Sequence, residues 1–196
     1  MSWWRGVRVA VKPTALPLSH SELSLRTRVD SHQDDSALLE SYQRSAVASI
    51  DGPDGIGYAM LTQTWERVMD WFPATIVLPG FPIQSVESIT YRDASDAEQT
   101  VDPSDYELIN AYEPAVIEPV AGWPVVGRRR GTVVVRYVLG HATPSDVPDD
   151  LRDAVALMVA HRYENRQPVV MGSSVTELPM GVGPIIEKYR RTRVAA

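Results

Sequence analysis

Two stretches of the chain carry the hydrophobic spacing of helices. Between residues 34 and 50, apolar side chains recur every three or four positions, as on one face of an amphipathic helix. They are Leu38, Leu39, Tyr42, Ala46, Val47 and Ile50. Pro148 and two aspartates open the second stretch, where they suit a first helical turn, and Pro168 follows its end. Because residues 154–160 are apolar nearly all round, the pattern predicts a buried helix over residues 148–166.

Between these stretches the hydrophobic period changes to that of β-strands. Residues 86–91 alternate into a polar turn at 92–97, and a second short run returns at 99–101, which predicts a hairpin. Similar strand patterns occur at residues 61–71, 76–82, 106–109, 115–117 and 132–138. The prolines within 76–82 place that segment at a sheet edge or at a crossing between strands. The sequence predicts about five or six strands in this region.

The two ends of the chain carry weaker patterns. Residues 1–20 contain Pro13 and Pro17 and few periodic apolar positions, so we expect an extended arm. Near the other end, glycine-rich segments flank short stretches within residues 168–196. Residues 184–191 predict a last short helix there, in an arm that is otherwise extended.

The expected fold class is therefore α+β. It is a small helical bundle, with helices over about 22–50 and 148–166, that carries an inserted, mainly antiparallel β-sheet and hairpin region over residues 61–139. Extended N- and C-terminal arms flank a single domain over residues 21–167. A chain of 196 residues is long enough for one such domain, and we expect one hydrophobic core rather than two.

The composition excludes several functional classes. The chain has no cysteine, which removes disulfides, thiolate metal sites and thiol nucleophiles. Its 19 basic and 25 acidic residues give a formal charge of −6, which argues against generic nucleic-acid binding, since that affinity comes from neutralised phosphates. No stretch approaches the roughly 20 apolar residues of a membrane helix, so we expect no membrane contact. The N-terminal residues also lack the apolar core of a secretion signal.

The histidines offer one candidate constellation for catalysis. No two of the four histidines have metal-ligand spacing on a helix, so we expect no metal and no cofactor. His141 follows a predicted strand, and Asp146 and Asp150 follow within ten residues, as in a small hydrolase with a histidine general base. The competing interpretation assigns Asp150 to the start of the second helix. We favour that interpretation and expect that the protein is not an enzyme.

Basic and aromatic clusters are better candidates for contacts with partners. Three arginines lie between two glycines just before the strand at 132–138, which predicts a loop. This loop is either solvated or in contact with an acidic partner or DNA backbone. Apolar residues precede the basic residues 190–193, as expected of a segment that docks on another protein, although they would equally pack on their own bundle. The candidate partner interface comprises Pro179, Ile185, Ile186, Tyr189, Arg190 and Arg191, and the candidates for contacts between subunits or with a DNA channel are Trp3, Trp4, Arg128, Arg129 and Arg130.

Several segments share their order and spacing with one known family. They are Leu23–Asp30, Asp34–Glu40 with Tyr42, Leu78–Asp93 with Tyr106, Tyr137–Gly140, Val147–Val155, His161–Arg166, and Glu177–Val182 ahead of Tyr189-Arg190. Together they resemble the phage head–tail connector (adaptor) family, which also occurs in gene transfer agents. The chain departs from the family pattern at Ala94-Ser95-Asp96, where a glycine is expected after the aspartate, and at Trp3-Trp4, which has no counterpart.

The resemblance implies a virion structural protein without catalytic activity. Such a protein assembles as a ring of about twelve copies beneath the portal, which makes a dodecamer with cyclic symmetry. It extends the DNA channel toward the tail, and DNA passes through without specific binding. The implied partners are the portal, contacted by residues 168–196, and a downstream head-closure or stopper protein. The implied location is the neck of a phage or phage-like particle, after synthesis in the host bacterial cytoplasm. Another neck protein, such as a head-completion protein or tail terminator, is the alternative.

Overall fold

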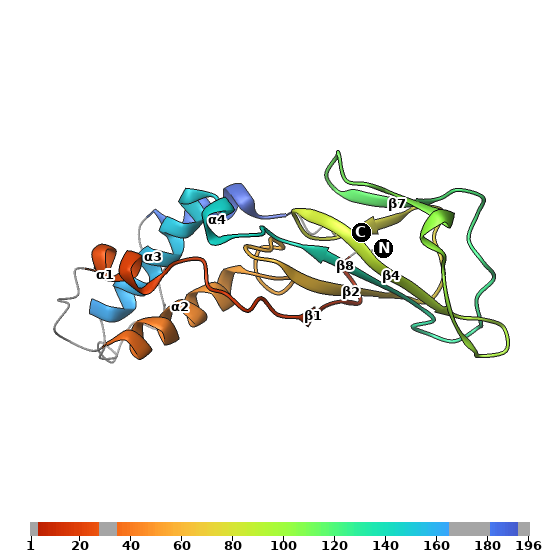
Figure 1. Ribbon diagram of the computed structural model, residues 1–196, viewed down its shortest axis with the longest axis horizontal. Coiled ribbons are helices and arrows are strands. Elements are labelled where there is room, and N and C mark those ends of the chain that lie inside the picture. Colours follow the sequence, from red (N-terminus) through yellow and green to blue (C-terminus); the bar gives the residue numbers. More distant parts are fainter. Residues whose placement is uncertain (1–3, 28–34, 165–180, 192–196) are drawn as a thin grey trace, which may run out of the picture.

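The structure is a computed structural model that describes residues 4–27, 35–164 and 181–191. The molecule is elongated, with the helices at one end and the strands at the other (Figure 1). In chain order the elements are β1 (Val7–Val11), α1 (His20–Thr27), α2 (Ser36–Ile50), β2 (Gln63–Met69), β3 (Ile76–Leu78), β4 (Ile83–Arg92), β5 (Glu98–Thr100), β6 (Tyr106–Ile109), β7 (Ala115–Pro119), β8 (Val133–Leu139), α3 (Asp149–Glu164) and α4 (Val182–Tyr189), with short 3-10 turns at Pro103–Asp105 and Pro144–Asp146. The predicted α+β class is confirmed.

The two main helices are those that the hydrophobic spacing predicts. α2 turns Leu39, Ala46 and Ile50 inward, and α3 is buried through Leu151, Val155 and other apolar side chains. Both α1 and α4 pack against α3, so the predicted short helix near the C-terminus belongs to the helical end of the molecule. The four helices thus share one buried cluster.

A five-stranded antiparallel sheet forms the body of the molecule. Its strand order is β1-β2-β8-β4-β5, so the first and last strands of the region 61–139 lie side by side. The predicted hairpin is β4 and β5, which pair from Thr90 with Thr100 to Arg92 with Glu98. The segment at 61–71 is strand β2, as expected. Seven strands rather than five or six lie between residues 61 and 139, because each of the seven segments with a strand pattern forms a strand of its own, including β3 and β5 with three residues each.

Strand β1 corrects the expectation that residues 1–20 form only an arm. It is the edge strand of the large sheet and pairs antiparallel with β2. Val7 and Val9 pack against the buried cluster of the sheets. Their alternation with Arg8 is a strand signal, but five residues close to two prolines are too short for the pattern to stand out.

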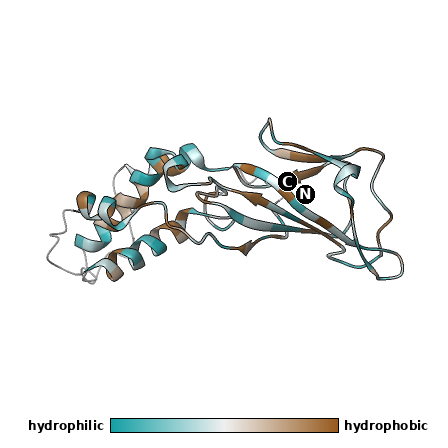
Figure 2. Cartoon of the chain, in the orientation of Figure 1, coloured by the Kyte–Doolittle hydropathy of each residue, from teal (hydrophilic) through white to brown (hydrophobic). Residues whose placement is uncertain are grey.

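A second, three-stranded sheet corrects the expectation of one core. Its order is β3-β7-β6, all antiparallel, and its inward side chains form a buried cluster with those of the large sheet. The helical end has a separate buried cluster, and Figure 2 shows hydrophobic residues at both ends of the molecule. The predicted edge segment 76–82 contains β3, which is at the edge of this second sheet.

A ladder of charges crosses the outer face of the large sheet. Arg8 Nε donates to Glu66 Oε2 at 2.8 Å, and Arg136 Nη1 lies 3.6 Å from Glu66 Oε1. Arg136 Nε lies 3.5 Å from Glu87 Oε1, so the ladder joins β1, β2, β8 and β4. The Glu66 side chain is only 12% exposed, which reduces the screening of its pairs by water.

Replacing Glu66 with glutamine tests this ladder. We expect the free energy of unfolding to fall by about 1–3 kcal/mol, because the poorly exposed Glu66 side chain loses its charged pairs with Arg8 and Arg136 while its shape is kept. Urea denaturation measures the loss. The control is Glu98→Gln, which removes the exposed pair with Arg92 at 3.7 Å and should leave stability unchanged. Equal effects of the two substitutions would contradict the assigned role of the ladder.

Candidate assembly surfaces

Helix α4 is fixed to the helical end by its apolar face. Val182 and Ile186 are buried in the helical cluster, and Ile185 and Tyr189 are half-buried against it. Within the single chain these candidate interface residues therefore pack on the chain's own bundle, the alternative that the sequence left open. The exposed side chains of the helix are Pro184, Glu187 and Lys188, with Arg190 directly after it. Pro179 lies outside the described residues.

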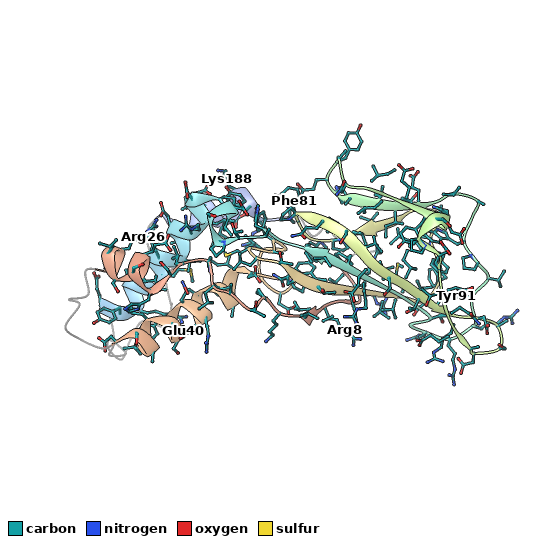
Figure 3. All side chains as sticks on the ribbon, viewed as in Figure 1. Arg8, Arg26, Glu40, Phe81, Tyr91 and Lys188 are labelled. Atoms are coloured by element: carbon teal, nitrogen blue, oxygen red, sulfur yellow. The ribbon has the colours of Figure 1, made fainter. Side chains whose placement is uncertain are left out.

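Arg191 joins the end of α4 to the body of the molecule. Its backbone N–H donates to the carbonyl of Ile56 at 2.9 Å, and its guanidinium forms an ion pair with Glu113. The guanidinium carbon lies 4.7 Å from the ring centroid of Phe81 and 5.5 Å from that of Tyr58. Figure 3 shows Phe81 where the helices meet the strands. Arg191 is therefore largely occupied by contacts within the chain.

The candidate hydrolase residues are used in structural contacts. His141 Nε2 lies 2.8 Å from the hydroxyl of Tyr58. Asp146 accepts from the backbone and side chain of Thr143 and closes a 3-10 turn. Asp150 accepts from Tyr189 and Lys188, both at 2.6 Å, and so anchors α4. The carboxylates that a hydrolase would require thus hold secondary structure in place.

The ionisation of this cluster follows from the same contacts. Burial lowers the pKa of His141, an effect that the carboxylate of Asp146 opposes. Burial raises the pKa of Tyr58 to about 12, with the nearby Tyr189 acting in the same direction. Burial also acts to raise the pKa of Asp150, but hydrogen bonds from Lys188 and Tyr189 outweigh it and lower that pKa. At neutral pH the His141 ring is therefore neutral and Asp150 is charged.

The lowered pKa of His141 predicts a pH dependence of stability. The unfolded chain binds this proton more strongly than the folded chain, so the contribution is complete above the unfolded pKa of about 6.5 and is lost as the pH falls from there toward the folded pKa. We expect His141→Gln to lose less stability than the wild type between pH 7 and pH 5, as measured by denaturation at each pH. A variant that loses the same stability, or more, over this range would contradict the assignment.

The arginine loop lies at the strand-rich end. Arg128, Arg129 and Arg130 are all exposed in the connection to β8, as expected. Arg129 Nη1 lies 2.6 Å from Asp96 Oδ2 at the β4–β5 hairpin tip. Within the described part of the chain, neither Arg128 nor Arg130 has an ion-pair partner.

The hairpin tip forms without the glycine expected there. Asp96 itself adopts a left-handed backbone with φ of 67°, a conformation that aspartate tolerates better than most residues. The carboxylate of Asp93 accepts from Ser95, Ala97 and Gln99 across the turn. Hydrogen bonds from Ser95 and Gln99 hold the pKa of Asp93 at about 2. The capped turn thus replaces the glycine.

Trp4 is held by contacts inside the chain. Its ring centroid lies 6.3 Å from that of Trp65, and it packs against the cluster between the sheets. Trp3 lies outside the described residues, so only Trp4 of this candidate pair is placed.

Residues 4–27, 35–164 and 181–191 carry neither a membrane-spanning helix nor a cluster of metal ligands. No helix in these ranges has the length and apolar character needed to cross a membrane. No group of three His, Asp or Glu side chains there is arranged to hold a metal ion. A hollow of about 360 Å³ lies beside α1 and α2, lined by Leu16, Leu18, Leu23 and polar side chains.

Comparisons with solved structures give full-length similarities. No family model and no curated protein matches the sequence. A chain in the neck of an empty GTA particle computed with C6 symmetry is 24% identical, with a TM-score of 0.74 and 97% of both chains covered. A chain in the virion of a native gene transfer agent (GTA) particle is 27% identical, with a TM-score of 0.73 and the same coverage. A chain in the neck of a native GTA particle computed with C12 symmetry is 26% identical, with a TM-score of 0.67, and covers 95% of this chain and 97% of that one.

These similarities extend over both sheets and the helical end. They confirm the resemblance to the connector group that occurs in gene transfer agents, and they support a structural protein of the particle neck. The chain is therefore similar, over nearly its whole length, to structural components of a gene transfer agent particle.

Proposed function

We propose that the protein is the head–tail connector (adaptor) of a gene transfer agent or related phage-like particle. The observation that carries this proposal is the full-length similarity to chains of GTA necks and virions. The C6 and C12 symmetries of those necks support a ring, which we take to contain about twelve copies. The ring forms under the portal and extends the DNA channel toward the tail, where a stopper protein follows.

The charge of the chain suits a channel wall. A formal charge of −6 disfavours tight binding of DNA phosphates, so DNA moves past the ring without being held. The alternative use of His141 in catalysis has no support from the contacts of Asp146 and Asp150, which stabilise a turn and α4. The proposed role is therefore mechanical.

We assign portal docking to residues 168–196. Because Val182 and Ile186 are buried, the contact surface on α4 is its exposed side, which ends at Arg190. Deleting the whole segment would also remove these two side chains from the helical cluster. A surface substitution therefore tests docking without opening the core.

Co-elution with the portal encoded by the same genome tests the proposal. We expect wild-type protein to co-elute with the portal, and Arg190→Glu to reduce the bound fraction about tenfold by reversing a rim charge. His141→Ala is the control and should bind the portal as the wild type does. If the protein were a hydrolase, this substitution would also spare assembly but would abolish an enzymatic activity. Absence of co-elution by the wild type would contradict the adaptor role, and binding to a tail component instead would indicate a tail terminator.

A further inference from the structure

The geometry points to a specific contact between neighbouring copies. We propose that the Glu107–Glu118 face of the small sheet in one copy binds the Arg128–Arg130 loop of the next copy. The proposal rests on the ring inferred above and names two surfaces that form it.

The outer face of the small sheet has no covering element among the described residues. Along β6 and β7 the side chains alternate, so that Leu108 and Ile117 point into the buried cluster while Glu107 and Glu118 are exposed. The half-exposed pair Ile109 and Val116 lies next to the glutamates, and Val77 of β3 pairs with Val116 on the same face. This face combines an apolar strip with two carboxylates.

The two glutamates are placed unfavourably for an isolated chain. Glu107 and Glu118 are directly opposite each other in the β6–β7 ladder, an arrangement in which like charges destabilise a sheet. Neither carboxylate has an ion pair with any residue of the described ranges. A cationic partner would turn this repulsion into attraction, so the surface is complementary to a basic one.

The chain itself carries the complementary surface. Arg128 and Arg130 are exposed and have no ion pair in the described residues, while Arg129 holds the loop to Asp96. The connection from β7 to β8 passes around the tip of the strand-rich end, and its last part, beside the β4–β5 hairpin, lies on the edge opposite β7 (Figure 1). Tyr91 marks the same end in Figure 3.

In a ring with cyclic symmetry, each copy contacts its two neighbours through two different surfaces, which lie at the same level along the ring axis. A heterologous ring contact places one face of a subunit against another face of its neighbour. The glutamate face and the arginine loop meet this requirement, since they lie at one end of the molecule and on opposite edges. Nucleic acid would be repelled by the glutamates, so a second copy is the occupant that matches both surfaces.

Charge reversal tests the contact in the complex with the portal. We expect Arg128→Glu with Arg130→Glu, and separately Glu107→Arg with Glu118→Arg, each to lower the number of rings on portals about tenfold or more. The chain with all four substitutions restores opposite charges at every interface and should assemble to within about twofold of the wild type. Arg5→Glu with Lys12→Glu, both exposed on or beside β1, gives the same change of net charge as the arginine reversal and should assemble normally.

Each other outcome overturns the contact. The contact is ruled out if both reversed variants assemble normally. It is also ruled out if the fourfold variant folds but does not form rings, or if the Arg5 and Lys12 control loses as many rings as the arginine reversal. If the arginine reversal spares rings but alters DNA retention, the loop faces DNA instead. None of these outcomes contradicts the adaptor role, provided that the wild-type protein forms rings on the portal. Failure of the wild type to form rings would overturn both.

Cross-linking gives a second readout that does not depend on charge. The chain has no cysteine, so Glu118→Cys and Arg128→Cys can be made separately and mixed with the portal. A short bifunctional maleimide should then join one copy of each variant, and neither variant alone should cross-link with itself. The assigned pairing would be contradicted if each variant alone formed cross-links with itself. It would also be contradicted if no cross-link formed between the two variants in assembled rings.

Discussion

Trp65→Ala is expected to lower the free energy of unfolding by about 3–5 kcal/mol, the largest effect of any single substitution considered for this protein. Trp65 of β2 is fully buried in the cluster between the two sheets, next to the rings of Trp4 and Tyr137. Its Nε1 donates to Gln63 Oε1 at 2.8 Å, so truncation leaves a cavity and also leaves the buried Oε1 of Gln63 without this donor. Gly80 packs on this ring with φ of 97°, and a Cβ there would lie 2.6 Å from it.

Trp71 provides the matched control. It follows the end of β2 and is 52% exposed, so Trp71→Ala should change stability by no more than about 0.5 kcal/mol. Equilibrium denaturation of the two variants, followed by circular dichroism, gives the comparison. Similar losses from both substitutions would mean that the cluster between the two sheets does not stabilise the fold as described.

Ile186→Ala is expected to release helix α4 from the bundle. Ile186 is only 7% exposed and packs in the helical cluster, so its truncation should cost about 2–4 kcal/mol. An eight-residue helix has little stability of its own, so we expect the loss to appear as local opening. At about 1.4 kcal/mol per tenfold change, backbone amides of α4 should exchange about 30 to 700 times faster.

Leu25→Ala is the control for this change. Leu25 on α1 is 82% exposed, so the same kind of truncation should leave hydrogen exchange unaltered. Mass spectrometry of deuterated peptides that cover residues 182–189 resolves the difference. Unchanged exchange of α4 in Ile186→Ala would show that the polar anchor at Asp150 alone holds the helix.

Helices and the β4–β5 hairpin were predictable because their signals are local. The apolar spacing of 34–50 and the charged first turn of 148–166 are confirmed by α2 and α3, which need only their own sequence and a core to pack against. Strand β1 carries the alternation of Val7, Val9 and Val11, but its pairing with β2 depends on a segment more than fifty residues away along the chain. The local hydrophobic pattern therefore does not predict that β1 pairs with β2.

The second sheet and the candidate contact surfaces depend on register. Nothing in the sequence places Glu107 opposite Glu118, because the pairing of β6 with β7 is set by the packing of Leu108 and Ile117 into the cluster. The position of Arg191 over Phe81 likewise follows from the docking of α4. By contrast, the arginine loop was visible from its flanking glycines, and the structure places it where the sequence predicts.

Negative-stain electron microscopy of the protein mixed with the portal of its own genome shows directly whether the adaptor ring forms. We expect a closed ring of added density on one end of each portal, with about twelve copies and a central channel. Arg190→Glu should reduce the fraction of portals that carry this ring. Portals that remain bare in the presence of excess wild-type protein would contradict the adaptor role.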